Sequence, residues 1–153
     1  MTFTVASPDA MRDLGERIAP DLGAGDLVVL SGQLGAGKTT LAQGIGRGLG
    51  VTGAVVSPTF VIARVHRGGR LPLVHVDAYR LSSIEEVDDL DLDASLEESV
   101  TLVEWGEGLV EGLAGDRLLV TIERPAANDD ETRSVVITGF GERWDGLVSG
   151  RWR

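Results

Sequence analysis

One segment, residues 32–40, constrains the fold of this chain more than any other. It reads GQLGAGKTT and comes one residue after the apolar run at residues 27–30. The pattern Gly-x-x-x-x-Gly-Lys-Thr between an apolar strand and an amphipathic helix is the phosphate-binding P-loop. A chance glycine-rich turn would not need strand, Lys-Thr pair and helix in this order. The segment therefore predicts a nucleotide site in an α/β fold.

The residue types of this loop suit a polyphosphate. Glycines at positions 32, 35 and 37 let the backbone turn tightly, so that several N–H groups can surround an anion. Lys38 adds a positive charge for the β- and γ-phosphates, and the hydroxyl of Thr39 suits Mg²⁺. The helix that follows directs its positive N-terminal end at the same place.

The length and composition favour one soluble domain. At roughly 100–200 residues per domain, we expect residues 1–153 to form a single domain. No apolar run approaches the ~20 residues that span a bilayer, and the N-terminus lacks a continuous apolar signal segment, so we expect a cytoplasmic protein without membrane contact. The chain has no cysteine, and its two histidines lack a partner at metal-ligand spacing, so we expect ordinary strand histidines.

The charge argues against a chain that binds nucleic acid unaided. The formal net charge is −10, whereas affinity for nucleic acid comes largely from Lys and Arg. Residues 85–98 hold eight carboxylates and no Lys or Arg. This run is either a solvated face or a docking surface for a basic partner.

The hydrophobic pattern predicts alternating helices and strands. Helices are expected over residues 7–20, with Ser7 as N-cap, and 38–49, with Gly50 as the stop; shorter ones are expected over 83–90, 95–99 and 107–113. Strands are expected over residues 26–30, 55–65, 71–76, 100–103, 117–122 and 135–138. We therefore predict a three-layer α/β fold with a mixed, mostly parallel central sheet and antiparallel hairpin additions.

Two acids follow apolar strands and are candidates for the chemistry. Asp77 and Glu104 each stand at the carboxyl end of such a strand, where a P-loop protein places a metal-binding acid. One of them would bind Mg²⁺ with Thr39 while the other orients the attacking water; the sequence leaves the assignment open. Thr59, in Ser-Pro-Thr, could sense the γ-phosphate or could belong to a plain turn. Trp105 is expected in the core, although stacking on a base or contact with a partner are alternatives.

Four motifs together resemble one family. GQLGAGKTT, VSPTF, HVDAYRL and VEWGE, in this order, resemble the TsaE (YjeE) family of bacterial P-loop ATPases. The resemblance implies ATP binding and hydrolysis with Mg²⁺, in support of threonylcarbamoyladenosine formation beside the anticodon of tRNA. It implies TsaB and TsaD as protein partners, with tRNA contacted only indirectly through the complex.

The resemblance also assigns residues. It implies Thr39 and Glu104 as Mg²⁺ ligands and Asp77 as the acid on which hydrolysis depends, and it places Thr59 and Trp105 in nucleotide- and partner-sensitive segments. Gln33 departs from the family, which usually has Asp there. Adenine contacts are expected from the start of the first helix, around Pro8, and from Arg133. The implied phosphate cradle consists of Leu34, Gly35, Ala36, Gly37, Lys38, Thr39 and Thr40.

Two other functions use the same loop. A small-molecule kinase would bind Mg²⁺ and nucleotide in the same way, but it usually gathers several arginines and a lid around the transferred group. Here the arginines after the loop are scattered. A nucleotide-gated binding module without useful hydrolysis is the second alternative.

Overall fold

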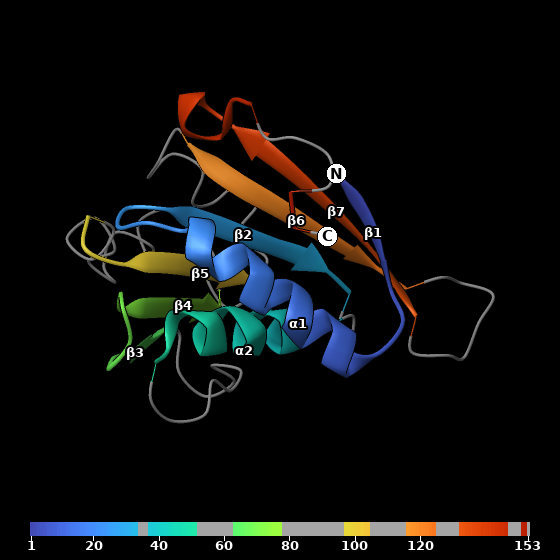
Figure 1. Cartoon of the computed structure of the whole chain (residues 1–153), viewed down its shortest axis with the longest axis horizontal. Helices are drawn as coiled ribbons and strands as arrows, with labels where there is room; N and C mark the ends of the chain where they lie inside the picture. Colours follow the sequence, from blue (N-terminus) through green and yellow to red (C-terminus); the bar gives the residue numbers. More distant parts are fainter. Residues whose placement is uncertain are drawn as a thin grey trace.

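The strands that the structure describes form one sheet of seven, in the order β1-β7-β6-β2-β5-β4-β3 (Figure 1). The computed structural model describes residues 1–33, 37–51, 63–77, 97–104, 116–124, 132–146 and 151–152. Two α-helices of this described part lie side by side on one face of the sheet. In chain order the elements are β1 (Thr2–Val5), α1 (Pro8–Ile18), the short 3-10 helix η1 (Ala19–Asp21), β2 (Leu27–Gly32), α2 (Lys38–Leu49), β3 (Ala63–His66), β4 (Leu73–Asp77), β5 (Val100–Glu104), β6 (Arg117–Glu123), β7 (Arg133–Phe140) and the 3-10 helix η4 (Glu142–Trp144).

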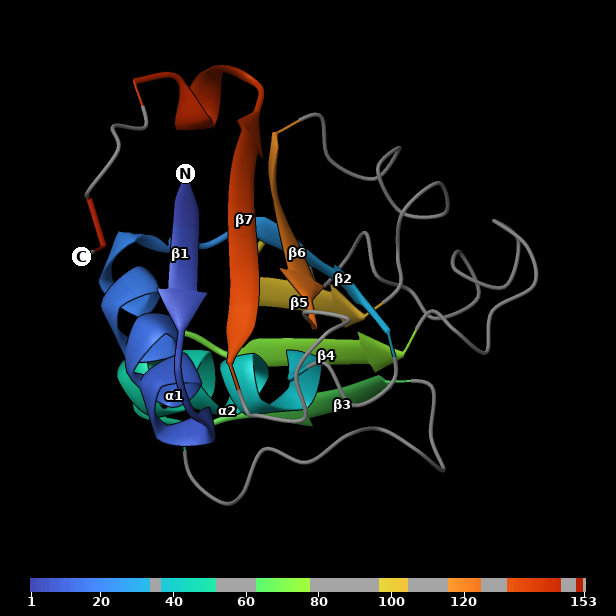
Figure 2. The ribbon, with the colours of Figure 1, turned by 90° about the vertical axis from the view of Figure 1, so that its right-hand side faces the viewer.

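The centre of the sheet is parallel and its margins are antiparallel. β6, β2, β5 and β4 run in one direction. β3 pairs antiparallel with β4, β7 with β6, and β1 with β7. Figure 2 shows β1 and β7 side by side at one margin, with β3 and β4 at the other. The predicted α/β fold with a mixed sheet and antiparallel additions is confirmed.

The central strands are buried on both faces. Val28 and Leu102 belong to the core that α1 and α2 cover, whereas Val29 and Val103 point to the opposite face and are also buried. This explains their continuous apolar runs, because a one-sided strand would alternate with polar residues. The helices expected over residues 83–90 and 107–113 lie outside the described residues. The short helix expected over residues 95–99 is wrong in its described part, since residues 97–99 form a turn.

The first helix begins where its capping residues predict. The side chain of Ser7 accepts a hydrogen bond from the backbone N–H of Ala10 at 3.1 Å, and Pro8 occupies the first helical position. Met11, Leu14 and Ile18 are buried on the face that meets the sheet and α2. α1 therefore starts at the edge of the sheet where β1 ends and runs back along its face.

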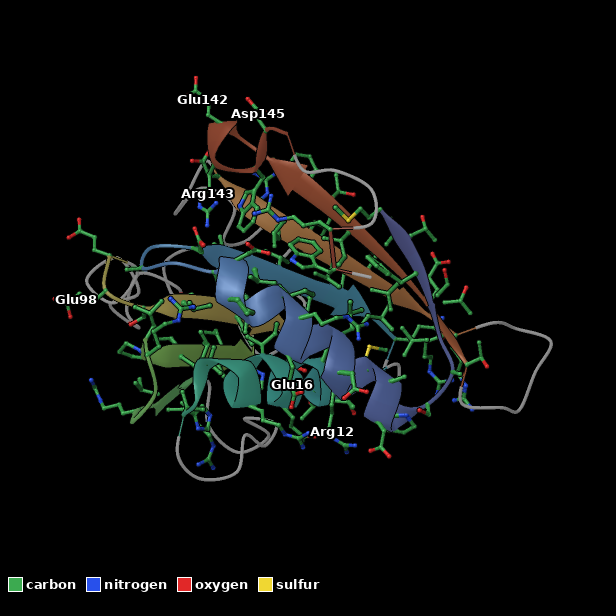
Figure 3. The ribbon with its side chains drawn as sticks, viewed as in Figure 1. Arg12, Glu16, Glu98, Glu142, Arg143 and Asp145 are labelled. Atoms are coloured by element: carbon green, nitrogen blue, oxygen red, sulfur yellow. The ribbon has the colours of Figure 1, made fainter. Side chains whose placement is uncertain are left out.

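Glycines bring the two helices into close contact. A Cβ on Gly44 would overlap the carbonyl oxygen of Arg12, and one on Gly15 would lie 2.7 Å from the backbone nitrogen of Ile45. Two side chains of α1 also contact α2: Arg12 donates a hydrogen bond to Gln43, and Glu16 accepts one from Arg47 (Figure 3). Gly44 and Gly48 of α2, which would weaken an isolated helix, are therefore explained by the close approach of α1 and η1.

We expect Gly44→Ala to destabilise the protein. Alanine favours a helix by about 1 kcal/mol over glycine, but the added methyl group would overlap the backbone of Arg12, and such overpacking costs roughly 1–3 kcal/mol. In a chain of this size the loss should lower the melting midpoint by several degrees. Gly23→Ala is the matched control, because its nearest neighbour would be 3.8 Å away. An unchanged midpoint for Gly44→Ala would mean that the helices are further apart.

Residues near the C-terminus bind the segment between α1 and β2. Trp152 is buried, and its indole N–H donates to Asp21 Oδ2 at 2.7 Å, while Arg151 forms an ion pair with the same carboxylate. Arg143 binds the buried Asp26 with two hydrogen bonds of 3.2 and 3.0 Å. These contacts anchor the start of β2, the strand that leads into the loop.

Candidate nucleotide and metal site

The loop between β2 and α2 ends in a backbone conformation that favours glycine. Gly37 has φ of 118°, in the left-handed region, and it is the N-cap of α2. The thioether methyl of Met11 in α1 would lie only 3.3 Å from a Cβ at this position. Leu34, Gly35 and Ala36 lie outside the described residues, so their part in the phosphate cradle stays a prediction.

Lys38 is held by the backbone that leads into the loop. Its ammonium donates to the carbonyl oxygens of Gly32 at 2.6 Å and Gln33 at 3.3 Å, and the residue is only 8% exposed. The cation is thus fixed by the backbone at the start of the loop, in a position where little water surrounds it. A positive charge in such surroundings interacts strongly with an anion.

Thr39 and Glu104 meet directly. β5 pairs with β2 so that Glu104 stands beside Leu30, and the hydroxyl of Thr39 donates to Glu104 Oε1 at 3.1 Å. The two residues come from positions 65 apart in the chain. The pair that the family resemblance implied as Mg²⁺ ligands is therefore brought together by the parallel pairing of β5 with β2.

Glu104 is buried, and yet its carboxyl group has a lowered pKa. It is 5% exposed, and this burial by itself would raise its pKa. The neighbouring His75 and Thr39, together with the charge of Lys38, outweigh burial and lower the pKa of Glu104 below its ordinary value. The site therefore offers a charged oxygen ligand.

His75 is a residue of this site that sequence reasoning missed. It lies in β4, is fully buried, and places Nε2 3.3 Å from Glu104 Oε2. The expectation of an ordinary strand histidine took account only of metal-ligand spacing. One signal was available. His75 stands two residues before Asp77, and alternate residues of a strand share a face. Because β4 pairs with the strand that ends in Glu104, His75 is on the same face as both acids.

The second acid ends the neighbouring strand. Asp77 is the last residue of β4 and stands in register with Glu104, so the two acids lie beside each other at the carboxyl edge of the sheet. Only the backbone of Asp77 is described. Thr59 and Trp105 lie outside the described residues, so their roles stay predictions.

The remaining predicted contacts lie at the same edge of the sheet. Thr40 is a partly buried residue in the first turn of α2. Pro8 begins α1 just after β1, and Arg133 begins β7 in register with Val5, the last residue of β1. Because β1 runs in the same direction as β2, these positions share the edge where β2, β4 and β5 end.

The oxygen atoms present fit Mg²⁺ bound together with a phosphate. Mg²⁺ prefers oxygen ligands and usually keeps several waters with one or two protein groups. A hydroxyl and a charged carboxylate 3.1 Å apart, next to Lys38, supply such a set. Within the described ranges, no group of three or more His, Asp or Glu side chains forms a self-sufficient metal site. No helix among them is long and apolar enough to cross a membrane.

Comparisons with known proteins agree with this geometry. A family model described as threonylcarbamoyl adenosine biosynthesis protein TsaE matches residues 5–135. A protein of Streptomyces coelicolor named tRNA threonylcarbamoyladenosine biosynthesis protein TsaE is 64% identical over 138 residues, which cover 88% of this chain and 93% of that protein. The protein of the same name from Bacillus subtilis is 38% identical over 148 residues, covering 96% and 90%.

A solved structure has the same fold. The crystal structure of YdiB from Bacillus subtilis superposes with a TM-score of 0.78 at 32% sequence identity, covering 96% of this chain and 90% of that one. Nucleotide binding by a P-loop agrees with this relationship. The chain therefore belongs to the TsaE family, and its role lies in the biosynthesis of threonylcarbamoyladenosine in tRNA.

Proposed function

We propose that this protein binds ATP with Mg²⁺ and hydrolyses the ATP slowly, in support of tRNA modification. The observation that carries the proposal is the hydrogen bond between Thr39 and the charged, buried Glu104, beside the ammonium of Lys38. These three groups stand where a strand-loop-helix unit meets the carboxyl ends of parallel strands. That is the place where open α/β sheets bind their ligands.

The residues divide the work in this proposal. Lys38 provides positive charge for the phosphates, and the backbone of residues 34–40 surrounds them. Thr39 and Glu104 would hold Mg²⁺, which neutralises charge on the phosphates when bound. Asp77, the acid that stands in register with Glu104 at the end of the neighbouring strand, orients the attacking water. Thr59 senses the γ-phosphate.

TsaB and TsaD are the proposed partners, and tRNA is reached only through them. The net charge of −10 supports an indirect role, since a chain with 24 acidic and 14 basic residues is repelled by a phosphate backbone. In this proposal the protein supplies a nucleotide-dependent step to the partners that hold the tRNA.

Alanine substitutions of the two acids test the division of roles. We expect Glu104→Ala to weaken the Mg²⁺ dependence of nucleotide binding, because it removes the charged oxygen next to Thr39. Asp77→Ala should keep ATP and Mg²⁺ binding but lose turnover. A Mg²⁺ titration at fixed ATP, followed by measurement of ADP and free phosphate, separates the two effects.

The same experiment distinguishes the alternatives. Release of ADP and free phosphate in equal amounts supports an ATPase. Transfer of the γ-phosphate to an added acceptor would instead indicate a kinase. Tight nucleotide binding without any product would indicate a nucleotide-gated module. If Asp77→Ala lost Mg²⁺ dependence and Glu104→Ala kept it, the two roles would be reversed.

A further inference from the structure

His75 occupies a position that packing alone does not explain. It lies in the middle of β4 with none of its surface exposed, and β4 pairs with β5 so that His75 stands beside Leu102 on the face covered by the helices. Two neighbours of His75 on this face, Leu73 in the same strand and Leu102 in β5, are apolar and fully buried, while the exposed Arg64 stands opposite His75 in β3. Burial of an imidazole among such residues is unfavourable unless its nitrogens find polar partners.

The polar group that His75 approaches is Glu104. Its Nε2 lies 3.3 Å from Glu104 Oε2, while the other oxygen of the same carboxylate accepts the hydroxyl of Thr39 at 3.1 Å. Among the described residues, neither ring nitrogen yet has a partner with full hydrogen-bond geometry. In structures without a ligand, hydrogen bonds at functional sites are often long or poorly aligned and tighten only when the ligand is bound.

We infer that His75 is a positioning residue, which donates from Nε2–H to Glu104 Oε2 and so keeps Oε1 directed at Thr39 and the metal site. A carboxylate that binds a metal is usually itself hydrogen-bonded, and loss of such an outer partner typically weakens metal affinity about 10–100-fold. This inference rests on the proposed function, because it takes Glu104 as the Mg²⁺ ligand.

A pair of substitutions separates positioning from packing. His75→Leu fills the site with an apolar side chain and removes the donor, whereas His75→Gln places an amide N–H near the position of Nε2. We expect His75→Leu to bind Mg²⁺ roughly 10–100-fold more weakly at saturating ADP, with little change in ADP affinity without Mg²⁺. His75→Gln should restore most of the Mg²⁺ affinity. Calorimetric titration of Mg²⁺ into the ADP complex measures both.

Thr101→Val is the matched control. Thr101 is buried in β5, its hydroxyl has no hydrogen-bond partner among the described residues, and its register with Leu27 and Val74 places it on the opposite face of the sheet. This substitution should leave Mg²⁺ affinity unchanged. If His75→Leu kept wild-type Mg²⁺ affinity, or if His75→Leu and His75→Gln were impaired equally, the positioning role would be wrong.

A measurement on the unaltered protein keeps the inference testable if the variants do not fold. The imidazole nitrogens of the chain's two histidines can be assigned by comparison with His66→Asn. The inference requires a proton on Nε2 of His75 and a change in its nitrogen-15 shift when Mg²⁺ and ADP bind. An unprotonated Nε2, with the proton on Nδ1, would overturn it.

Failure of this inference can be told from failure of the proposed function. If wild-type protein binds ADP equally well with and without Mg²⁺, and Glu104→Ala changes nothing, the metal site itself is misassigned. If Glu104→Ala weakens Mg²⁺ binding but His75→Leu does not, the metal site stands and only the role of His75 is rejected.

Discussion

Lys38→Ala should bind ATP with Mg²⁺ about ten- to a hundredfold more weakly than the wild type. A hydrogen bond to a charged group contributes roughly 1.5–3 kcal/mol, and each 1.4 kcal/mol is a tenfold change in affinity. Lys38 is only 8% exposed as a residue, and its ammonium is fixed by the carbonyl oxygens of Gly32 and Gln33, so little solvent screens its interaction with phosphate. Calorimetric titration measures the loss.

The substitution needs two controls because Lys38 also holds the loop. Its removal leaves the carbonyl of Gly32 without this donor, so the melting midpoint without nucleotide must be measured as well. Arg64→Ala removes the same charge from an exposed residue of β3 and should leave ATP affinity unchanged. A folded Lys38→Ala protein with wild-type affinity would contradict the assignment of the phosphate site.

Local sequence signals predicted the elements around the site. The helix expected over residues 38–49 has these bounds in α2, because Gly50, with φ of 79°, ends it. The strand expected over residues 100–103 and the acid after it form β5, and the C-terminal hairpin is present as β6 and β7. The meeting of Thr39 and Glu104 was expected from family resemblance, while its distance depends on the pairing of β5 with β2.

Features that depend on pairing between distant parts of the chain were not predicted from the sequence. β1 is only four residues long, and its pairing with β7 joins Thr2 to Val136. The ion pair between Arg151 and Asp21 links residues 130 positions apart. The contact of His75 with Glu104 also arises only when β4 and β5 align, since neither residue is close to the other in sequence.

The predicted adenine contacts illustrate the same limit. Pro8 and Arg133 were expected to contact adenine from the family resemblance alone, because no pattern in the sequence connects their two segments. The register of β1 with β7 brings both to the edge of the sheet where the loop lies. Contact of either residue with adenine stays a prediction.

TsaB and TsaD together should raise the turnover of this protein strongly. A group supplied by a partner to the γ-phosphate can increase the rate by ~10³–10⁵. Several arginines of the described part are engaged in contacts that hold the fold: Arg70 donates to the carbonyls of Ala19 and Leu22, while others pair with carboxylates. These others are Arg12, Arg47, Arg143 and Arg151. Isolated protein is therefore expected to hydrolyse ATP slowly.

Charge should contribute to the contact with these partners. Most of the acidic run at residues 85–98 lies outside the described residues, but Glu97 and Glu98 form an exposed turn just before β5, and Glu98 projects away from the sheet in Figure 3. Attraction between exposed charges is screened by salt, so raising the ionic strength should weaken the complex. Binding should also be tighter with ATP than with ADP if Thr59 senses the γ-phosphate.

Steady-state release of phosphate, with and without TsaB and TsaD at two salt concentrations, tests the central claim most directly. We expect slow release by the protein alone, a large increase when both partners are added, and a smaller increase at high salt. Lys38→Ala should show no stimulated release. Turnover that is unchanged by the partners, together with partner binding that is indifferent to ATP and ADP, would contradict the account.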